Sequence, residues 1–462
     1  MMVMKFGGSS LADAAAVERV SSIVASRLRR NPVVVVSAMG DTTDTLVSLL
    51  AAVERGDAAS ARRIASEIAV AYREARCAIG ADVSCGGAKR LEQELAALDR
   101  YVDGMLALGE VSPRSRDAVL AFGELATAGL FADALTARGI DAAALDPREV
   151  IATDSRHGAA TPDEALVCAL APRLVGPLLA AGVVPVIGGF VGATRDGVTT
   201  TLGRGGSDLT ASILAAGLGA DALEFWKDVD GILTADPRIV AEALPIPSLS
   251  FREASELAFL GARVLHPSSI KPAVDAMIPV RVLNSHHPEA PGTSIVRGPA
   301  EGRAHAAIAT SIAHKRDQVL VNVHSTRMLG ATGFLRRVFE VFDMLGISVD
   351  HVATSEVNVT VTIGSQPGIE RLAEELSQVA SITVRPGVGV VSVVGESLAA
   401  KPGAASRILG ALDGAKLELL TYGGFGVNLS VVVDDGEVDA AVQRLHAWIF
   451  GAPAARKEVR CG

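Results

Sequence analysis

The sequence predicts an α/β fold followed by two small repeated modules, and three observations support this prediction. Between residues 3 and 284, short runs of β-branched residues alternate with alanine-rich stretches of helical length, which is typical of parallel strands joined by crossover helices. After residue 304 the order of elements changes to a βαββαβ pattern that occurs twice. At 462 residues, the chain is too long for one hydrophobic core. We therefore expect a mostly parallel sheet covered by helices on both faces, followed by two ferredoxin-like domains.

The first domain is expected to span residues 1–285. Helical apolar spacing over residues 14–30 and 161–181 supplies two of its crossover helices. Residues 51–112 carry glutamate, arginine and leucine at helical periods without any strand signal, so they are expected to form a helical insertion with a solvated charged face. The predicted strands of this domain lie at residues 2–6, 33–37, 140–145, 183–187, 222–226 and 280–284.

The C-terminal part is expected to begin with a linker at residues 286–304, where the apolar periodicity stops. The first module then covers residues 305–386, the second covers residues 387–450, and residues 451–462 form a polar tail. The second module lacks its last strand. We therefore expect residues 306–312 to pair with the second module, which would intertwine the two modules.

Composition and charge exclude several classes of protein. A net charge of −9 without a long basic run argues against a nucleic-acid partner. The uncharged stretch at residues 174–194 is interrupted by two prolines and five glycines, so it is not expected to span a membrane. Four cysteines without metal-ligand spacing, and no charged leader before the first strand, favour reduced thiols in a cytoplasmic protein. The histidines show no metal-binding spacing, and no protein-bound metal is expected.

The first candidate site is a glycine turn at the end of the first predicted strand. Gly7 and Gly8 allow backbone N–H groups to approach a phosphate, and the following helix adds partial positive charge. Lys5, at the end of the strand, could neutralise a phosphoryl group. An ordinary turn before a helix can have the same composition, so this motif alone leaves both interpretations open. The chain contains neither of the common glycine-rich nucleotide motifs, GxxxxGK[ST] and GxGxxG.

A second candidate site lies at residues 199–208, again between a strand-rich stretch and a helix. It combines glycines with Arg204, whose guanidinium can clamp a carboxylate, and with the carboxylate of Asp208. The alternative is a simple turn capped by Ser207 or Asp208. Polar groups at this density nevertheless favour a binding site.

A third candidate site lies at residues 225–238, where a strand is followed by a charged loop. Trp226 and Leu233 could form an apolar slot for a base, and Lys227 and Arg238 could meet phosphates. The loop also contains an Asp-Gly pair that is typical of a tight turn.

Two further groups of polar residues complete the candidate site. Glu124 heads a helix, where it could pair with a substrate ammonium group or only complement the helix dipole. Ser37 and Thr43 follow a buried strand, at a position where ligands gather in open α/β sheets.

Taken together, these motifs resemble those of the aspartate kinases, which belong to the amino-acid-kinase superfamily. The motifs follow the order of that family: KFGGSS at 5–10, SAMG at 37–40, FGE at 122–124, TTLGRGGSD at 200–208, WKDVDGILTADPR at 226–238 and GARVLHP at 261–267. The C-terminal modules resemble the tandem ACT domains of the same family, through HSTRMLGATGFL at 324–335 and ISVDHVATSEV at 347–357. The resemblance implies an amino-acid-kinase-type three-layer sandwich followed by two ACT domains.

The resemblance also implies a reaction and its substrates. The expected activity is transfer of the γ-phosphoryl group of ATP, carried with Mg²⁺, to the side-chain carboxylate of L-aspartate. The product, 4-phospho-L-aspartate, starts the synthesis of lysine, threonine and methionine. An aspartate side chain with an ordinary pKa of about 3.9 is already ionised at neutral pH, so no general base is required. The site must instead align the substrates and neutralise charge.

By resemblance, Lys5 stabilises the transferring phosphoryl group and Asp208 organises that lysine or the Mg²⁺–phosphate cluster. Arg204 is expected to bind the α-carboxylate of the substrate and Glu124 its α-ammonium, with Ser37 and Thr43 in the same pocket. The residues expected to contact ATP are Lys5, Gly7, Gly8, Ser9, Lys227, Asp228, Leu233, Arg238 and Arg263. Three of these depart from the common family residues: Lys227 replaces a threonine, Leu233 a tyrosine and Arg263 a lysine.

The first ACT domain is expected to bind an inhibitory amino acid, lysine or threonine or both. Asp350 would meet the ammonium group of this effector. The residues that match the effector site of lysine-sensitive members are Met328, Phe334, Leu335, Ser348, Val349, Asp350, Ser355 and Glu356. The resemblance further implies a homodimer or a dimer of dimers formed through the ACT domains.

Three alternatives remain open from the sequence. The ACT pair could serve dimerisation alone. The protein could phosphorylate another carboxylate within the same superfamily, or it could be a catalytically inert amino-acid sensor that kept the fold.

Overall fold

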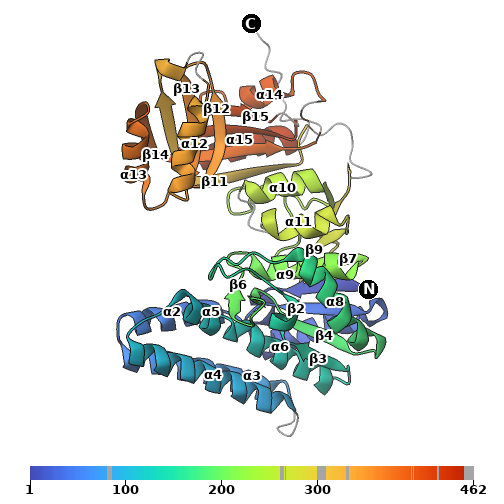
Figure 1. Ribbon diagram of the computed structural model, residues 1–462. Coiled ribbons are helices and arrows are strands. Elements are labelled where there is room, and N and C mark those ends of the chain that lie inside the picture. Colours follow the sequence, from blue (N-terminus) through green and yellow to red (C-terminus); the bar gives the residue numbers. More distant parts are fainter. Residues whose placement is uncertain are drawn as a thin grey trace. The chain divides into compact units, whose positions relative to one another are not determined.

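The computed structural model describes residues 1–80, 86–260, 265, 267–298, 308–328, 332–396, 398, 400–423 and 426–451. The chain forms two compact units (Figure 1). The first unit contains Met1–Ile232 and Val264–Gly298, and the second contains Leu233–Arg263 and Pro299–Gly462.

A mostly parallel sheet forms the centre of the first unit, as the sequence predicts. Its central strands at residues 2–6, 32–36 and 184–188 are wholly buried and mostly apolar, which is typical of parallel sheets covered on both faces. All six predicted strands are present. In spatial order the strands are β3 (Ala142–Leu145), β4 (Val184–Gly188), β2 (Pro32–Val36), β1 (Met2–Phe6), β7 (Ala222–Lys227), β9 (Val280–Asn284) and the antiparallel β10 (Thr293–Val296).

Helices cover both faces of this sheet. Helices α1 (Ala14–Ala25) and α6 (Phe122–Ala137) share a core with Met2, Met4 and Phe6 of β1. Because side chains alternate along a strand, Lys5 points to the opposite face, where α9 (Gly206–Leu218) packs on β1. The helices beside α9 are α8 (Glu164–Ala180) and α11 (Pro267–Asp275), and a short helix, α7 (Pro147–Val150), precedes α8.

The predicted helical insertion is confirmed. It consists of α2 (Thr42–Glu54), α3 (Ala58–Ala78) and α4 (Gly86–Leu108), and the last two run side by side (Figure 1). These helices form a core of their own with α5 (Pro113–Leu120) and the start of α6. In the described part of the chain, one stretch is long and apolar enough to cross a membrane. It is Pro113–Ala137, and 78% of its most apolar 18-residue window is buried inside the fold, as expected of helices in a core.

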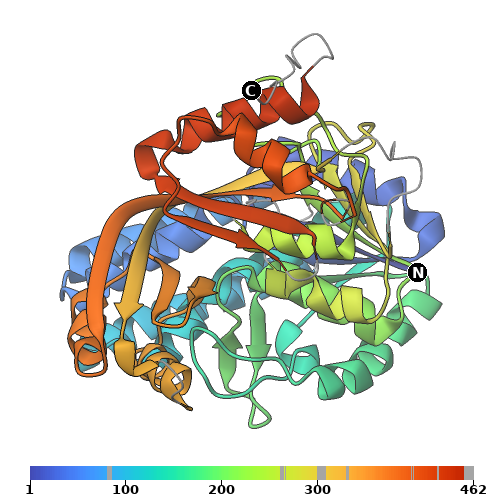
Figure 2. The same ribbon diagram turned by 90° about the horizontal axis from the view of Figure 1, so that it is seen from above.

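The second unit contains a six-stranded antiparallel sheet with helices packed on it. Two of its strands, β11 (Ser311–His324) and β14 (Ser381–Val394), are long and lie side by side at its centre (Figure 2). The spatial order is β12 (Val349–Thr354), β13 (Asn358–Gly364), β11, β14, β16 (Asn428–Asp434) and β15 (Leu419–Tyr422). The helices are α12 (Phe334–Met344), α13 (Ile369–Ser377), α14 (Ala404–Ala411) and α15 (Val438–Phe450).

The two modules share these long central strands. The first part of β11, Ser311 to Lys315, pairs with Val394 to Val390 of β14, next to β16 of the second module. The last part of β11 pairs with β13 of the first module. Residues 306 and 307 of the predicted strand 306–312 lie outside the described residues. The strand begins at Ser311 and continues directly into the next predicted strand.

Two segments near the predicted domain boundary contain elements that the sequence did not indicate. The segment 286–304, predicted as a linker, contains β10, which pairs with β9 because Thr293 and Ile295 alternate as buried residues with Ser294 and Val296. Within the predicted catalytic domain, residues 1–285, one segment is part of the other compact unit. Residues 233–263, with β8 (Ser248–Ser250) and α10 (Phe251–Phe259), belong to the second unit because Ala235 and Val240 enter its core.

Candidate active site

A cavity of about 290 Å³ opens at the carboxyl ends of β1 and β2, where ligands bind in open α/β sheets. All of its lining residues belong to the first unit. They are Lys5, Gly8, Ser37, Ala38, Gly40, Thr43, Glu124, Phe190, Gly203, Gly205, Gly206, Ser207 and Asp208.

Two lysines share one carboxylate at this cavity. The Nζ atom of Lys5 lies 2.7 Å from Oδ1 of Asp208, and the Nζ atom of Lys227 lies 2.9 Å from Oδ2. Lys5 comes from β1, Asp208 from the first turn of α9, and Lys227 from the end of β7. We call these three residues the lysine–aspartate cluster. It carries two positive charges and one negative charge, so it favours an anionic ligand.

Burial and charge oppose each other within this cluster. Burial and the neighbouring Lys227 lower the pKa of Lys5, although Asp208 raises it. Burial alone would raise the pKa of Asp208, but the two ammonium groups outweigh it and bring this pKa down to about 2. Asp208 is therefore ionised at neutral pH. It holds the two lysines and cannot serve as a general base.

Glu124 lies in the first turn of α6, with only 3% of its surface exposed. Its Oε2 atom has no hydrogen-bond partner among the described residues. Burial raises the pKa of this carboxyl to about 8, against smaller opposing effects from backbone groups and from Lys5. A buried carboxyl with one unpartnered oxygen is suited to bind a ligand cation.

Glycines let three backbone segments meet around the cavity. A Cβ atom at Gly8 would lie 2.8 Å from the carbonyl oxygen of Ala38 and 2.9 Å from that of Gly40, so a side chain does not fit there. Gly205 caps the N-terminus of α9 with a positive φ of 75°, and this helix N-terminus lines the cavity. A phosphate fits this arrangement of donors and ammonium groups.

Comparison with known proteins places this geometry in a family. Residues 1–284 match the model for the amino acid kinase family, and residues 391–448 match a model for an ACT domain. Aspartokinase 1, chloroplastic, of Arabidopsis thaliana is 37% identical to this chain, over 97% of the chain and 80% of the relative. The chain belongs to the aspartokinase family. Lysine-sensitive aspartokinase 3 of Escherichia coli strain K12 is 35% identical, over 97% of this chain and 99% of that relative.

Solved aspartokinase structures share the fold. The structure of E. coli aspartokinase III in complex with aspartate and ADP (R-state) has a TM-score of 0.85 and 33% identity, and it covers 97% of this chain and 100% of its own. The complex of that enzyme with lysine and aspartate (T-state) has a TM-score of 0.77 and 34% identity, over 97% and 99% of the two chains. The predicted family, fold class and kinase activity are thereby confirmed. As an aspartokinase, the protein uses ATP.

The predicted substrate residues differ in where their side chains lie. Ser37, Thr43 and Glu124 line the cavity. The side chain of Arg204 is exposed and forms no hydrogen bond or ion pair within the described part of the aspartokinase chain. Its neighbours Gly203 and Gly205 line the cavity, so a guanidinium on this loop can turn toward a ligand.

The predicted ATP residues fall into two groups. Lys5 and Gly8 line the cavity, while Gly7 and Ser9 are adjacent in sequence but do not line it. Lys227 belongs to the lysine–aspartate cluster, and Asp228 is exposed one residue later.

The remaining three predicted ATP residues, Leu233, Arg238 and Arg263, are not part of the first unit. Leu233 and Arg238 belong to the second unit, and the guanidinium of Arg238 pairs with Asp236. Arg263 lies outside the described residues.

One lining residue of the cavity, Phe190, lies outside every motif singled out from the sequence. Phe190 follows β4 with a positive φ of 65°, which is uncommon for a residue with a side chain. Ser207, within the second candidate site, is the second residue of α9, and a Cβ atom at Gly189 would lie 2.6 Å from its Cβ atom. The Gly-Gly-Phe sequence after a buried strand was the available signal for this close approach.

The predicted effector residues lie in the first module, and one requires correction. The phenyl ring of Phe334 is only 2% exposed and belongs to the core under α12, so it does not offer a side-chain contact to an effector. Asp350 is part-buried and pairs with Lys315, whose Nζ atom lies 2.9 Å from Oδ2. The exposed members of the set are Leu335, Ser348, Ser355 and Glu356, and the half-buried members are Met328 and Val349.

Proposed function

We propose that this aspartokinase transfers the γ-phosphoryl group of ATP to the side-chain carboxylate of L-aspartate, giving 4-phospho-L-aspartate and ADP. The observation that supports the proposal most strongly is that Lys5, Asp208 and Glu124 line one cavity, with Lys227 paired to Asp208. The cluster suits an anionic phosphoryl group. Glu124 suits the ammonium group that distinguishes an amino acid from other carboxylic acids.

In the proposed reaction, a carboxylate oxygen of the substrate attacks the γ-phosphorus atom. The bond between that phosphorus and the oxygen bridging to the β-phosphate breaks, and ADP leaves with the bonding electrons. Lys5 and Lys227 neutralise the negative charge on the transferring group, and Asp208 keeps both ammonium groups in place. The attacking carboxylate is already ionised, so the absence of a general base among these residues is chemically acceptable.

We propose that Glu124 binds the α-ammonium of L-aspartate and Arg204 its α-carboxylate, with Ser37 and Thr43 as further polar contacts. Binding of an ammonium favours the ionised form of Glu124. Because the pKa of this group is about 8, substrate binding at neutral pH should release a proton.

For ATP, we propose phosphate contacts from Lys5, Gly7, Gly8 and Ser9, and further nucleotide contacts from Lys227, Asp228, Leu233, Arg238 and Arg263. Mg²⁺ would enter with the phosphates of ATP. Among the described residues, no group of three or more histidine, cysteine, aspartate or glutamate side chains is arranged to hold a metal ion. ATP-bound Mg²⁺ needs few protein ligands.

We also propose that the product serves lysine, threonine and methionine synthesis, with inhibition by lysine or threonine at the first ACT domain. The name of the lysine-sensitive E. coli relative and the lysine complex of E. coli aspartokinase III support this regulation. The carboxylate of Asp350 would then bind the effector ammonium in place of the ammonium of Lys315.

We further propose that the ACT domains join two or four subunits. A cytoplasmic location is supported by Cys77 and Cys168, which are free thiols.

The direct test is ADP release with ATP, Mg²⁺ and L-aspartate, followed by separate titrations of lysine and threonine. Turnover that depends on aspartate supports the proposal. Turnover with L-glutamate in place of aspartate would indicate a different carboxylate kinase, and no turnover with either amino acid would indicate an inert sensor.

A further inference from the structure

One buried tyrosine of the helical insertion contacts the backbone segments that carry cavity residues. Tyr72 lies on α3 and is fully buried, and its ring packs edge-on against Phe122 at 5.4 Å between centroids. Its hydroxyl oxygen lies 2.9 Å from Oγ1 of Thr127, 3.1 Å from the carbonyl oxygen of Gly123 and 3.4 Å from Oγ1 of Thr42. Burial is the main reason that the pKa of this phenol rises to about 12, so it remains a neutral hydrogen-bonding group.

The groups around this hydroxyl form a closed set of hydrogen bonds. The N–H group of Met39 donates to Oγ1 of Thr127 at 3.0 Å, and that hydroxyl donates to the carbonyl oxygen of Gly123 at 2.7 Å. Thr42 donates to the carbonyl oxygen of Met39 at 2.5 Å. Tyr72 can then donate to Thr127, so that every hydroxyl hydrogen in the set has an acceptor.

Each backbone segment in this set carries a residue of the cavity. Gly123 directly precedes Glu124, Thr42 directly precedes Thr43, and Met39 lies between Ala38 and Gly40. The two segments are in close contact, because a Cβ atom at Gly123 would lie 2.6 Å from the Cβ atom of Ala38. A small change in their spacing would therefore move the carboxyl of Glu124 relative to the hydroxyl of Thr43.

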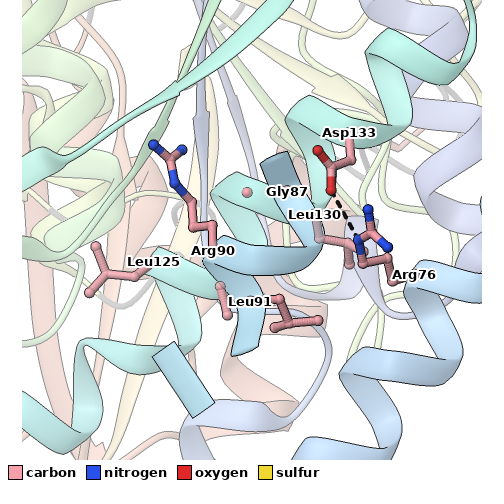
Figure 3. A pocket seen from close by; sticks show the side chains of 9 residues that line it. Arg76, Gly87, Arg90, Leu91, Leu125, Leu130 and Asp133 are labelled. Carbon is pink, nitrogen blue, oxygen red and sulfur yellow. Dashed lines mark hydrogen bonds and ion pairs between the residues drawn. The ribbon is translucent and has the colours of Figure 1, made fainter. Parts of the chain in front are cut away.

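A second contact fixes α3 on α6 one helical turn further on. Arg76 is four residues after Tyr72 and thus lies on the same face of α3. Its Nε atom lies 3.1 Å from Oδ2 of Asp133 on α6, and Figure 3 shows this pair beside Gly87 and Leu130. Both side chains are largely buried, with 9% and 15% of their surfaces exposed. Tyr72 is consequently held at a defined position along α6.

We propose that Tyr72 is a positioning residue of the amino-acid substrate site: its hydroxyl, supplied by the helical insertion, sets the spacing between the loop at residues 37–43 and the start of α6. This inference rests on the proposed function, since it assumes that Glu124 and Thr43 bind L-aspartate. Tyr72 itself does not line the cavity. It acts through the segments that do.

The test is a kinetic comparison of Tyr72→Phe with Tyr101→Phe, a control at an exposed tyrosine on α4. Tyr72→Phe keeps the buried ring, and Thr127 still satisfies the carbonyl oxygen of Gly123, so the variant should fold. We expect KM for L-aspartate to rise about five- to tenfold, the effect of one hydrogen bond, while KM for ATP changes less than twofold. Tyr101→Phe should change neither constant.

A second pair of variants keeps the proposal testable if Tyr72→Phe is poorly folded. Thr127→Val removes the shared hydroxyl and should also raise KM for aspartate, whereas Thr127→Ser retains it and should restore the normal value. An unchanged KM for aspartate in both Tyr72→Phe and Thr127→Val would overturn the proposal, as would an equal rise in KM for both substrates. Failure of the proposed function is distinguishable, because the unaltered enzyme would then show no aspartate-dependent turnover.

Discussion

Replacing Glu124 with glutamine should stabilise the ligand-free protein at alkaline pH while weakening the binding of substrate. The carboxyl is 3% exposed, its Oε2 atom has no partner among the described residues, and burial raises its pKa from 4.5 to about 8. The cost of ionising this group in the folded state follows from that interval. The interval of 3.5 pH units, at about 1.36 kcal/mol per unit, corresponds to roughly 5 kcal/mol.

The sign of the effect follows from proton linkage. Between pH 4.5 and pH 8 the folded state keeps the proton on Glu124 and the unfolded state loses it, so the free energy of unfolding falls as the pH rises. Glutamine has the same shape and cannot ionise. The stability difference between Glu124→Gln and the unaltered protein should therefore be near zero at pH 4.5, grow through neutral pH and reach a plateau above pH 8.

The assay is urea-induced unfolding of both proteins, without ligands, at several pH values from 5 to 9. We expect Glu124→Gln to be more stable by roughly 3 to 5 kcal/mol at pH 8.5. Glu110→Gln, at an exposed glutamate, is the matched control and should show no such trend. A difference that stays constant with pH, or that makes Glu124→Gln less stable at pH 8.5, would refute the reasoning. The same variant should raise KM for aspartate at least tenfold, because the partner of the ammonium group is lost.

Three further predictions concern charged groups. Lys5→Ala should lower kcat by about a thousandfold without changing effector binding or the melting temperature, as measured by ADP release, calorimetry and thermal unfolding; near-normal turnover would contradict the assigned role. Asp208→Asn should lower the free energy of unfolding at pH 7 by roughly 3 kcal/mol, because two largely buried ammonium groups lose their counter-charge, and a denaturation curve unchanged from the parent would show that the pairing matters little. Asp350→Asn should weaken inhibition by the effector at least tenfold and leave kcat intact, as read from inhibition curves; inhibition of normal strength would place the effector ammonium elsewhere.

The sequence by itself determined the main strands of the first sheet, the helical insertion and the family. The valine-rich run at residues 33–36 predicts a buried strand. The helical spacing of charged and apolar residues after residue 51 predicts amphipathic helices, and these form a core of their own. Two glycines meet local requirements of the backbone. Gly8 allows the close approach of neighbouring carbonyl groups, and Gly205 adopts a positive φ. Lys5, Glu124 and Asp208 could be chosen because each lies at the end of a strand or the start of a helix, where functional groups meet in this fold.

Only the tertiary structure decided which side chains share a partner. Lys227 shares the carboxylate of Asp208 with Lys5, because β1 and β7 are adjacent in space although they are distant in the chain. The hydroxyl of Tyr72 and the ring of Phe190 gave no periodic signal, since one tyrosine on a helix and one phenylalanine after a strand look like ordinary core residues. Residues 233–263 belong to the second unit although residues of the first unit precede and follow them in the chain. The reason is that Ala235 and Val240 are buried in the core of the second unit. Local sequence patterns thus predict helices, strands and candidate site residues. The ion pairs, the burial and the pKa of a side chain depend on neighbours that are distant in the chain and meet it only in the folded protein.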